Sequence, residues 1–284
     1  NKTILDNMYN EKREPLFEQL SLFQSILKKN TAYKNTLLQL VDSGGLSYVK
    51  SWDFKSYGAN LQVRSSVKNM IQNKKLIIGS EITRGGLMVV ATCPLIGEID
   101  EDETIADAYL GSVDFILKYN SLVYKRDNPK DKRDVLVLVK KDLLPKTSIV
   151  KDPEIIADYY VDLKKKNIDQ KFLKAAQKLD IENLLKQGYL TDENYFYTYT
   201  YIYDINKKQV GMYLLGNDID VVNFTVNTTA NIIKSQIYII TTILIIMILI
   251  FAVLFRILIN TPINSFTSLL KELSSGDGYL TKRL

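Results

Sequence analysis

The chain has 284 residues and a net charge of +5, from 37 basic and 32 acidic side chains, with no histidine and a single cysteine, Cys93. It therefore lacks the commonest general base and metal ligand and cannot form an internal disulfide, so we expect no catalytic residues, no metal site and no cofactor. The basic residues do not gather in one stripe, which disfavours nucleic-acid binding, and the composition favours a binding module over a metalloenzyme or a triad hydrolase.

The N-terminal region, residues 1–37, is predicted to be dominated by one long amphipathic helix. Pro15 lies inside this stretch and is expected to kink the helix or to split it in two. The apolar stripe has two interpretations: it packs against its own domain, or part of it pairs with a second subunit. The stripe consists of Leu5, Leu16, Leu20, Phe23 and Leu27, at helical spacing.

Residues 38–145 predict a first α+β module, an antiparallel sheet that carries a short helix. Strands are expected at residues 46–52, 75–82, 87–95, 109–117 and 134–140, and a helix at 61–72. The other expected features are a turn at 42–45, an acidic hairpin loop at 98–104, a short helix near Leu122 and a turn at 127–131.

A smaller second module is predicted for residues 146–220. Residues 153–186 are expected to be mostly helical. Residues 188–205 hold tyrosine at every second position from Tyr195 to Tyr203, which predicts a strand with one half-buried aromatic face rather than a stacking platform for bases. A loop at residues 206–208 and a returning strand at 209–216 complete the module.

From Val221 the pattern becomes helical, so residues 221–236 are expected to form an exit helix. The 19 residues from Ile237 to Phe255 carry no charge and are almost wholly apolar, and Arg256 ends the run. About 20 apolar residues in a helix cross the bilayer hydrocarbon. Residues 237–255 are therefore predicted to be a transmembrane helix in contact with membrane lipid.

The basic residues after this span predict its orientation. Arg256, Lys271, Lys282 and Arg283 place the short tail in the cytoplasm by the positive-inside rule. The protein is then expected in the inner (cytoplasmic) membrane, with residues before Lys234 in the periplasm or outside the cell. Because no signal peptide is evident, we expect an earlier membrane helix in the native protein.

The tail, residues 256–284, has a specific spacing of motifs. Pro262-Ile263 follows the span, Phe266, Leu269 and Leu273 recur at helical spacing, and the chain ends in the run from Gly276 to Arg283, GDGYLTKR. This pattern resembles the first helix and the start of the connector of a HAMP linker, as found in bacterial chemoreceptors and sensor kinases.

The region before the span resembles a double Cache sensor, an extracytoplasmic relative of PAS domains. The residues that carry the resemblance are Gly79-Ser80-Glu81, Arg84-Gly85-Gly86-Leu87, Pro94 and Gly111-Ser112-Val113-Asp114-Phe115. Residues 48–64 are also similar to the family's strand, turn and helix, although the motif is degraded at Ala59-Asn60.

The two resemblances imply an α+β fold: a long N-terminal helix with two PAS-like (Cache) antiparallel-sheet modules, then a transmembrane helix and a HAMP helix. They imply the sensory half of a methyl-accepting chemotaxis protein, a homodimer that acts through a cytoplasmic chemotaxis kinase and coupling protein. The alternatives are the input region of a sensor histidine kinase or nucleotide cyclase, and a structural or adhesive membrane protein without a ligand.

A small-molecule site is expected near the first sheet, at Tyr48, Trp52, Tyr57, Arg64, Arg84 and Asp114. An arginine there suits the carboxylate of an organic acid or amino acid, with an uncharged heterocycle as the alternative ligand. Each residue also has a structural interpretation: Trp52 in the core, Arg64 and Arg84 on the surface, and Asp114 facing solvent or a structural arginine.

Overall fold

The computed structural model describes residues 2–31, 33–101, 104–119, 133–163 and 168–275. The chain forms two compact units, Asn1–Ile219 and Asp220–Leu284, which are described separately. The short helix expected near Leu122, the turn at 127–131 and the run from Gly276 to Arg283 lie outside the described residues.

The N-terminal region forms two helices, α1 (Lys2–Tyr9) and α2 (Arg13–Asn30), instead of one. The break lies at residues 10–12, where Glu11 adopts a left-handed conformation with φ of 54°. Pro15 falls in the first turn of α2, where its missing N–H removes no helical hydrogen bond. The expected split therefore occurs, just before the proline.

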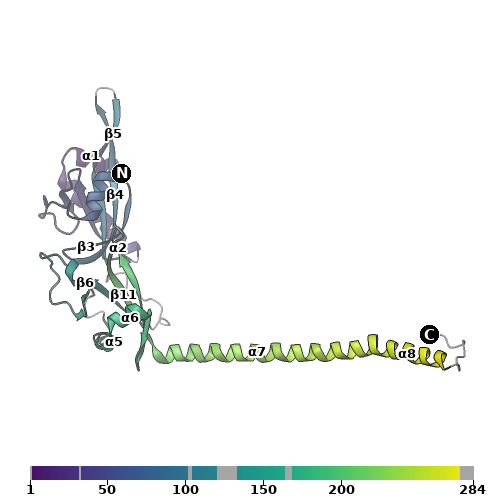
Figure 1. The fold of residues 1–284 in the computed structure, drawn as a ribbon. Helices are drawn as coiled ribbons and strands as arrows, with labels where there is room; N and C mark the ends of the chain where they lie inside the picture. Colours follow the sequence, from purple (N-terminus) through teal and green to yellow (C-terminus); the bar gives the residue numbers. More distant parts are fainter. Residues whose placement is uncertain (1, 32, 102–103, 120–132, 164–167, 276–284) are drawn as a thin grey trace. The chain divides into compact units, whose positions relative to one another are not determined.

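The first sheet has five antiparallel strands in the order β2-β1-β5-β4-β3. Figure 1 labels three of them, β3, β4 and β5. The strands of this sheet are β1 (Leu37–Asp42), β2 (Ser47–Lys50), β3 (Ile77–Thr83), β4 (Gly86–Glu101) and β5 (Thr104–Lys118), and α3 (Ser65–Asn73) is the helix between β2 and β3. The sequence predicted all of these except β1. The acidic hairpin is also present, but β4 and β5 pair as far as Glu101 and Thr104, so the loop is tighter than expected.

One face of this sheet packs against the N-terminal helices. Leu16 and Leu20 of α2 are buried against Leu38 and Leu40 of β1, together with Met8 of α1. Part of the predicted apolar stripe therefore packs within its own domain. Each of these side chains contributes on the order of 1.5–3 kcal/mol by leaving water.

The second sheet has six strands in the order β7-β8-β6-β11-β10-β9. The strands are β6 (Asp134–Lys140), β7 (Ile155–Ile156), β8 (Tyr159–Val161), β9 (Tyr189–Thr191), β10 (Tyr195–Tyr203) and β11 (Gln209–Asp218); a 3₁₀ turn, η1 (Lys141–Leu143), follows β6, and α5 (Gln170–Ala176) and α6 (Ile181–Gln187) precede β9. Residues 153–186 are thus not mostly helical, because β7 and β8 form a short hairpin. The strand at 134–140 is confirmed, but it pairs with β8 and β11 in this second sheet rather than in the first.

The tyrosine row of β10 is half-buried, as predicted. Tyr195 and Tyr197 are buried against Phe172 of α5, Tyr197 stacked on its ring and Tyr195 edge-on to it, whereas Tyr203 at the other end is exposed. A further cluster joins the two sheets, with Leu87 of β4 packing among Val137 of β6 and side chains of β8, β10 and β11. The two modules of the first unit therefore share a buried cluster between their sheets.

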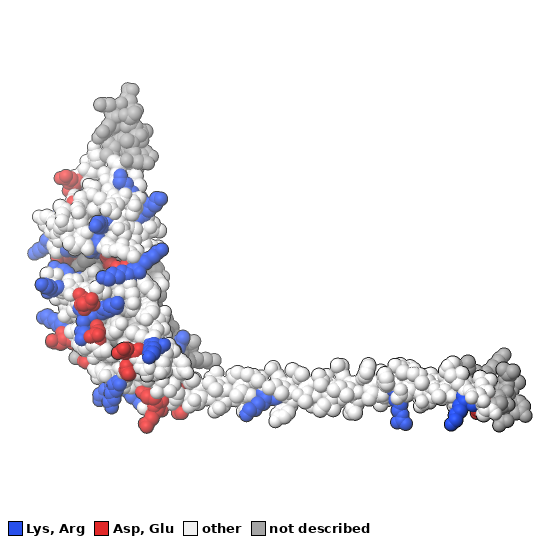
Figure 2. Space-filling model, in the orientation of Figure 1, with Lys and Arg blue, Asp and Glu red and all other residues white. Residues whose placement is uncertain are grey.

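The second unit contains a continuous helical run: α7 (Ile219–Phe255), a π-helical stretch η3 (Arg256–Asn260) and α8 (Thr261–Ser274). Among the described residues this is the one helix long and apolar enough to cross a membrane, with a mean hydropathy of 3.1 in its most apolar window and none of that window buried. Figure 2 shows charged side chains over the folded region and a largely uncharged surface along α7.

The π-helical stretch is explained by Pro262. A proline in the first turn of α8 cannot donate to the carbonyl four residues earlier, and its ring crowds that carbonyl. The preceding turn widens, so that the N–H of Thr261 bonds the carbonyl of Arg256, five residues back. Pro262 thus lies at the start of a helix, as expected, and the chain remains helical through it.

Candidate functional site

Arg64 is the centre of a buried charge cluster in the first sheet. Its Nε donates to Glu81 Oε1 at 2.6 Å, and its Nη1 donates to Asp114 Oδ2 at 2.8 Å. The side chains of Arg64, Glu81 and Asp114 are 10%, 5% and 0% exposed. These three residues are called the Arg64 cluster below.

Three elements position the cluster. Arg64 is the N-cap residue of α3, Glu81 lies near the end of β3, and Asp114 lies in the central strand β5. Val113 and Phe115 pack toward α1 and α2, so strand alternation points Asp114 to the opposite face of the sheet.

Two local features support this arrangement. Ser66 of α3 donates its backbone N–H and its hydroxyl to the Glu81 carboxylate, at 3.2 and 3.0 Å. Gly111 begins the Gly-Ser-Val-Asp-Phe motif with φ of +144°, and a side chain there would collide with the carbonyl of Val41. The glycine therefore lets β1 approach β5 closely beside Asp114.

The cluster has spare hydrogen-bonding capacity. Within the described residues, Asp114 Oδ1, Thr92 Oγ1 and Ser112 Oγ are buried without a hydrogen bond of acceptable geometry. Thr92 lies directly opposite Asp114 in β4, near enough for its hydroxyl to favour the ionised carboxylate. Buried polar atoms are nearly always bonded, so these atoms suit a ligand or water.

The electrostatics of the cluster are asymmetric. Burial raises the pKa of Asp114, because it disfavours the charged form more than Arg64 and Thr92 restore it. Burial by itself lowers the pKa of Arg64, but Asp114 and Glu81 more than offset this, and the net direction is upward. One guanidinium faces two carboxylates, so the ionised cluster carries one surplus negative charge.

The structure thus brings two of the six predicted site residues together, Arg64 and Asp114. Asp114 faces an arginine, which is one of the structural roles weighed for it, and the Arg64 side chain is not on the surface. Glu81 and Ser66 join them although they were not predicted as site residues. The signal for Glu81 was its place in the Gly-Ser-Glu motif, one strand away from Asp114.

The other four predicted residues lie elsewhere. Tyr48 packs in the cluster beneath α1 and α2, and Trp52 is exposed after β2 rather than in the core. Tyr57 is also exposed, and the guanidinium carbon of Arg13 lies 3.6 Å from the centroid of the Tyr57 ring. Arg84 is exposed in the turn between β3 and β4, as its surface interpretation predicted, and its Nε donates to the carbonyl of Thr147 at 3.0 Å.

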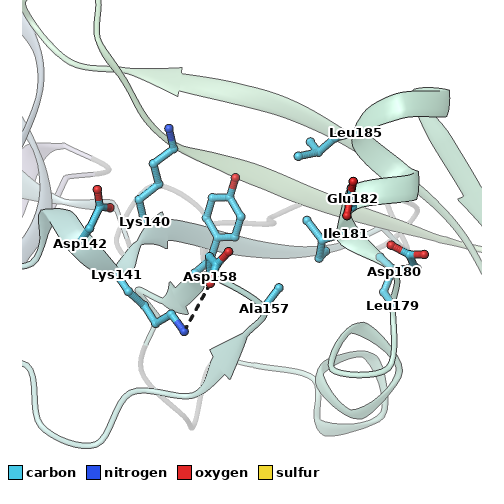
Figure 3. Close-up of a pocket in the computed structure, with 11 residues that line it drawn as sticks. Lys140, Lys141, Asp142, Ala157, Asp158, Leu179, Asp180, Ile181, Glu182 and Leu185 are labelled. Carbon is cyan, nitrogen blue, oxygen red and sulfur yellow. Dashed lines mark ion pairs between the residues drawn. The ribbon is translucent and has the colours of Figure 1, made fainter.

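An open cleft with a volume of about 910 Å³ lies in the second module (Figure 3). Lys140 and Lys141 lie on one side, and Glu182 and Leu185 of α6 lie on the other. The ion pair between Lys141 and Asp158 spans 3.8 Å, and the Asp158 side chain is 99% exposed. The charged groups of this pair are solvated, whereas those of the Arg64 cluster are buried, so we rank the cleft below the cluster as a candidate site.

No protein-family model and no curated protein matches the chain. Among solved structures, a domain of a sensory box/GGDEF family protein from Vibrio parahaemolyticus is similar at 14% identity, with a TM-score of 0.43 over 77% of this chain and 83% of that chain. The extracellular domain of the histidine kinase vpHK1S-Z8 is similar at 12% identity and a TM-score of 0.43, over 77% and 79% of the two chains. The ligand-binding domain of the amino acid chemoreceptor PctC of Pseudomonas aeruginosa PAO1, in complex with GABA, matches at 14% identity and a TM-score of 0.26, over 77% and 96%.

Proposed function

We propose that this chain is the sensory half of a transmembrane receptor of the chemotaxis type, and that it catalyses no reaction. Its outer domain, residues 1–219, binds a small molecule in the periplasm or outside the cell. Helix α7 begins at Ile219, directly after β11 ends at Asp218, so no linker separates the sensor from the membrane segment. The segment after Arg256 serves as the start of a HAMP linker.

The buried Arg64 cluster is the observation that carries the proposal. An ion pair buried only for stability is usually replaceable by apolar residues. Here an oxygen of Asp114 and the hydroxyls of Thr92 and Ser112 are buried without a well-aligned hydrogen bond, although Thr92 lies near Asp114 and Ser112 near Tyr109. A binding site explains that combination, because a ligand supplies the missing partners.

The charges favour a ligand with a cationic amine. Arg64 already faces Glu81 and Asp114, so it has little capacity for a further carboxylate, whereas Asp114 Oδ1 has no well-aligned donor and can accept from an ammonium. Of the two ligand types favoured by the sequence, we therefore propose an amino acid over an organic acid. The hydroxyls of Thr92 and Ser112 complete the acceptor set.

Isothermal titration calorimetry on the chain in lipid nanodiscs tests this proposal. The probes are glycine, γ-aminobutyrate, ethanolamine, succinate and uracil. We expect binding of one or more of the three amines, and binding about tenfold to hundredfold weaker in Asp114→Asn, because a hydrogen bond to a charged group is lost. Affinity should also fall as the pH is lowered through the raised pKa of Asp114, because the protonated carboxyl no longer balances the cation.

Asp158→Asn is the matched control, since it removes an exposed carboxylate from the second module. It should bind the amine like the unmodified chain. Binding of succinate or uracil alone would refute the amine assignment. A chain that binds none of the five probes, in a fold shown to be intact by circular dichroism, would favour a structural role.

The output domain to which this sensor is joined decides the output class. A long heptad-repeat hairpin supports the chemoreceptor, a homodimer that controls a chemotaxis kinase through a coupling protein. A kinase or cyclase catalytic domain supports the alternative receptor types.

A further inference from the structure

The hairpin between β10 and β11 contacts the elements that carry the Arg64 cluster. The backbone N–H of Ile205 donates to the carbonyl of Ser80 in β3 at 3.0 Å. Asn206 Nδ2 donates to Ser65 Oγ at 2.9 Å, and Asn69 Nδ2 donates to Asn206 Oδ1 at 3.2 Å. Asn206 therefore bridges two residues of α3.

These contacts lie one residue away from the cluster. Ser65 stands between Arg64 and Ser66, which bind Glu81, and Ser80 directly precedes Glu81. A shift of α3 or β3 that accompanies a change in the cluster must therefore change the hydrogen bonds of the hairpin.

The hairpin is built to transmit such a shift rather than absorb it. Asp204 Oδ1 accepts from the backbone N–H groups of both Asn206 and Lys208, at 2.9 and 2.8 Å. Gly79 of β3 leaves room for close approach, since a Cβ there would lie 2.9 Å from a side-chain carbon of Ile205. Beyond the hairpin, β11 runs to Asp218 and the chain continues directly into α7.

We propose that Asn206 is a positioning residue that couples the state of the Arg64 cluster to β11, and through β11 to the membrane helix. This inference rests on the proposed function, because it names how that same site is read out. A ligand shifts the equilibrium between two conformations of the domain only if it binds one of them better. Because Asn206 bridges the hairpin to α3, the position of the hairpin differs between these two conformations. By linkage, the hairpin influences the cluster to the same extent.

The test measures amide hydrogen exchange of Ile205, whose N–H bonds Ser80, in the full chain in nanodiscs without added ligand. Asp114→Asn perturbs the cluster, and Ser66→Ala is a milder perturbation should the first variant unfold. We expect either change to alter exchange at Ile205 by at least about fivefold, the lower end of allosteric couplings. In the Asn206→Ala background the same change should alter exchange by at least about twofold less, because of these contacts only the bond between Ile205 and Ser80 then remains.

Lys208→Ala is the matched control, because its side chain is exposed in the same hairpin, and it should retain the full effect. An effect of equal size with and without Asn206, or no effect in any background, would overturn the coupling. The calorimetric titration is scored separately. If the chain binds an amine but the exchange effect does not depend on Asn206, the coupling is refuted and the ligand class stands. If the exchange effect depends on Asn206 but the chain binds no amine, the coupling is supported and the ligand class is refuted.

Discussion

Asp162 is a half-buried carboxylate whose role differs from those of Asp114 and Glu81. It follows β8, and its Oδ2 accepts from the backbone N–H of Leu87 in β4 at 2.5 Å, so it connects the two modules. It also lines a cavity of about 260 Å³ together with Lys118. Burial raises its pKa to about 6, although the Leu87 N–H and Lys118 oppose the shift.

This pKa predicts the sign of a pH effect on stability. Between its ordinary value of 3.8 and about 6, the folded protein holds a proton on Asp162 that the unfolded chain releases. The contribution of Asp162 to the free energy of unfolding therefore falls as the pH rises through this window, by up to about 3 kcal/mol. Asp162→Asn keeps an acceptor for Leu87 and should lose this decline.

Chemical denaturation of the chain in detergent, from pH 4 to pH 7, checks the prediction. The difference in unfolding free energy between Asp162→Asn and the unmodified protein should grow with pH. Asp158→Asn, which changes an exposed carboxyl, should follow the unmodified curve. Parallel curves for all three proteins would show that Asp162 ionises normally.

The candidate site was predictable only in part. Arg64 and Asp114 were both named as site residues, and a structural arginine was one expectation for Asp114, but their pairing across 50 positions was not predicted. The side chains of Tyr48 and Trp52 were not predictable, because an irregularity in the β1–β2 pairing and the turn after β2 decide which way they face. Glu81 was not ranked as a site residue, because its position relative to α3 depends on tertiary packing.

Elements with clear periodicity were predicted closely, and short or atypical ones were not. The alternating tyrosines located β10 within the expected range of 188–205, although that range also contains β9, and β11 begins at Gln209 as predicted. β1 has four consecutive buried residues and no alternation, so it escaped prediction. β7 and β8 are only two and three residues long, which is too short for an alternating pattern to be recognised, so the surrounding segment was expected to be helical.

The membrane-proximal part of α7 is predicted to act as a stiff rod. Residues 223–231 are rich in Asn and Thr, which are weak helix formers, so their helicity depends on the neighbouring span. Inserting Gly-Gly between Asn227 and Thr228 should leave amine affinity unchanged and abolish the cytoplasmic response. The measurements are calorimetry on the chain and output activity in the full-length receptor.

The matched control replaces Thr228 and Thr229 by alanine, which keeps both the length and the helix. This control should respond normally. A normal response from the Gly-Gly insertion would refute transmission through a continuous helix.

The whole molecule is predicted to be a homodimer. Leu16 and Leu20 of α2 are buried against the first sheet. In contrast, Leu22, Phe23 and Ile26 of the same helix are 64%, 44% and 44% exposed. The apolar stripe thus serves its own domain and leaves a second apolar patch that a partner subunit would cover. In a Cys93→Ala background, single cysteines at positions 22 and 26 should crosslink between subunits in membranes.

Cysteines placed one at a time from Thr228 to Ile232 should crosslink with helical periodicity, because α7 runs beside its symmetry mate in a dimer of this type. Lys28→Cys, at an exposed polar position of α2, is the control and should crosslink poorly. A uniform profile at all positions would argue against a specific interface.

The position of β6 limits how evolution or an engineer can exchange these modules. β6 precedes all other strands of the second sheet in the chain, yet it pairs between β8 and β11 near the middle of that sheet. A gene fusion joined at residues 145–146 would leave β6 with the first module, where it has no strand to pair with. The transferred second module would then lack a central strand. Recombination that preserves both folds must therefore fall between Lys118 and Asp134, upstream of β6.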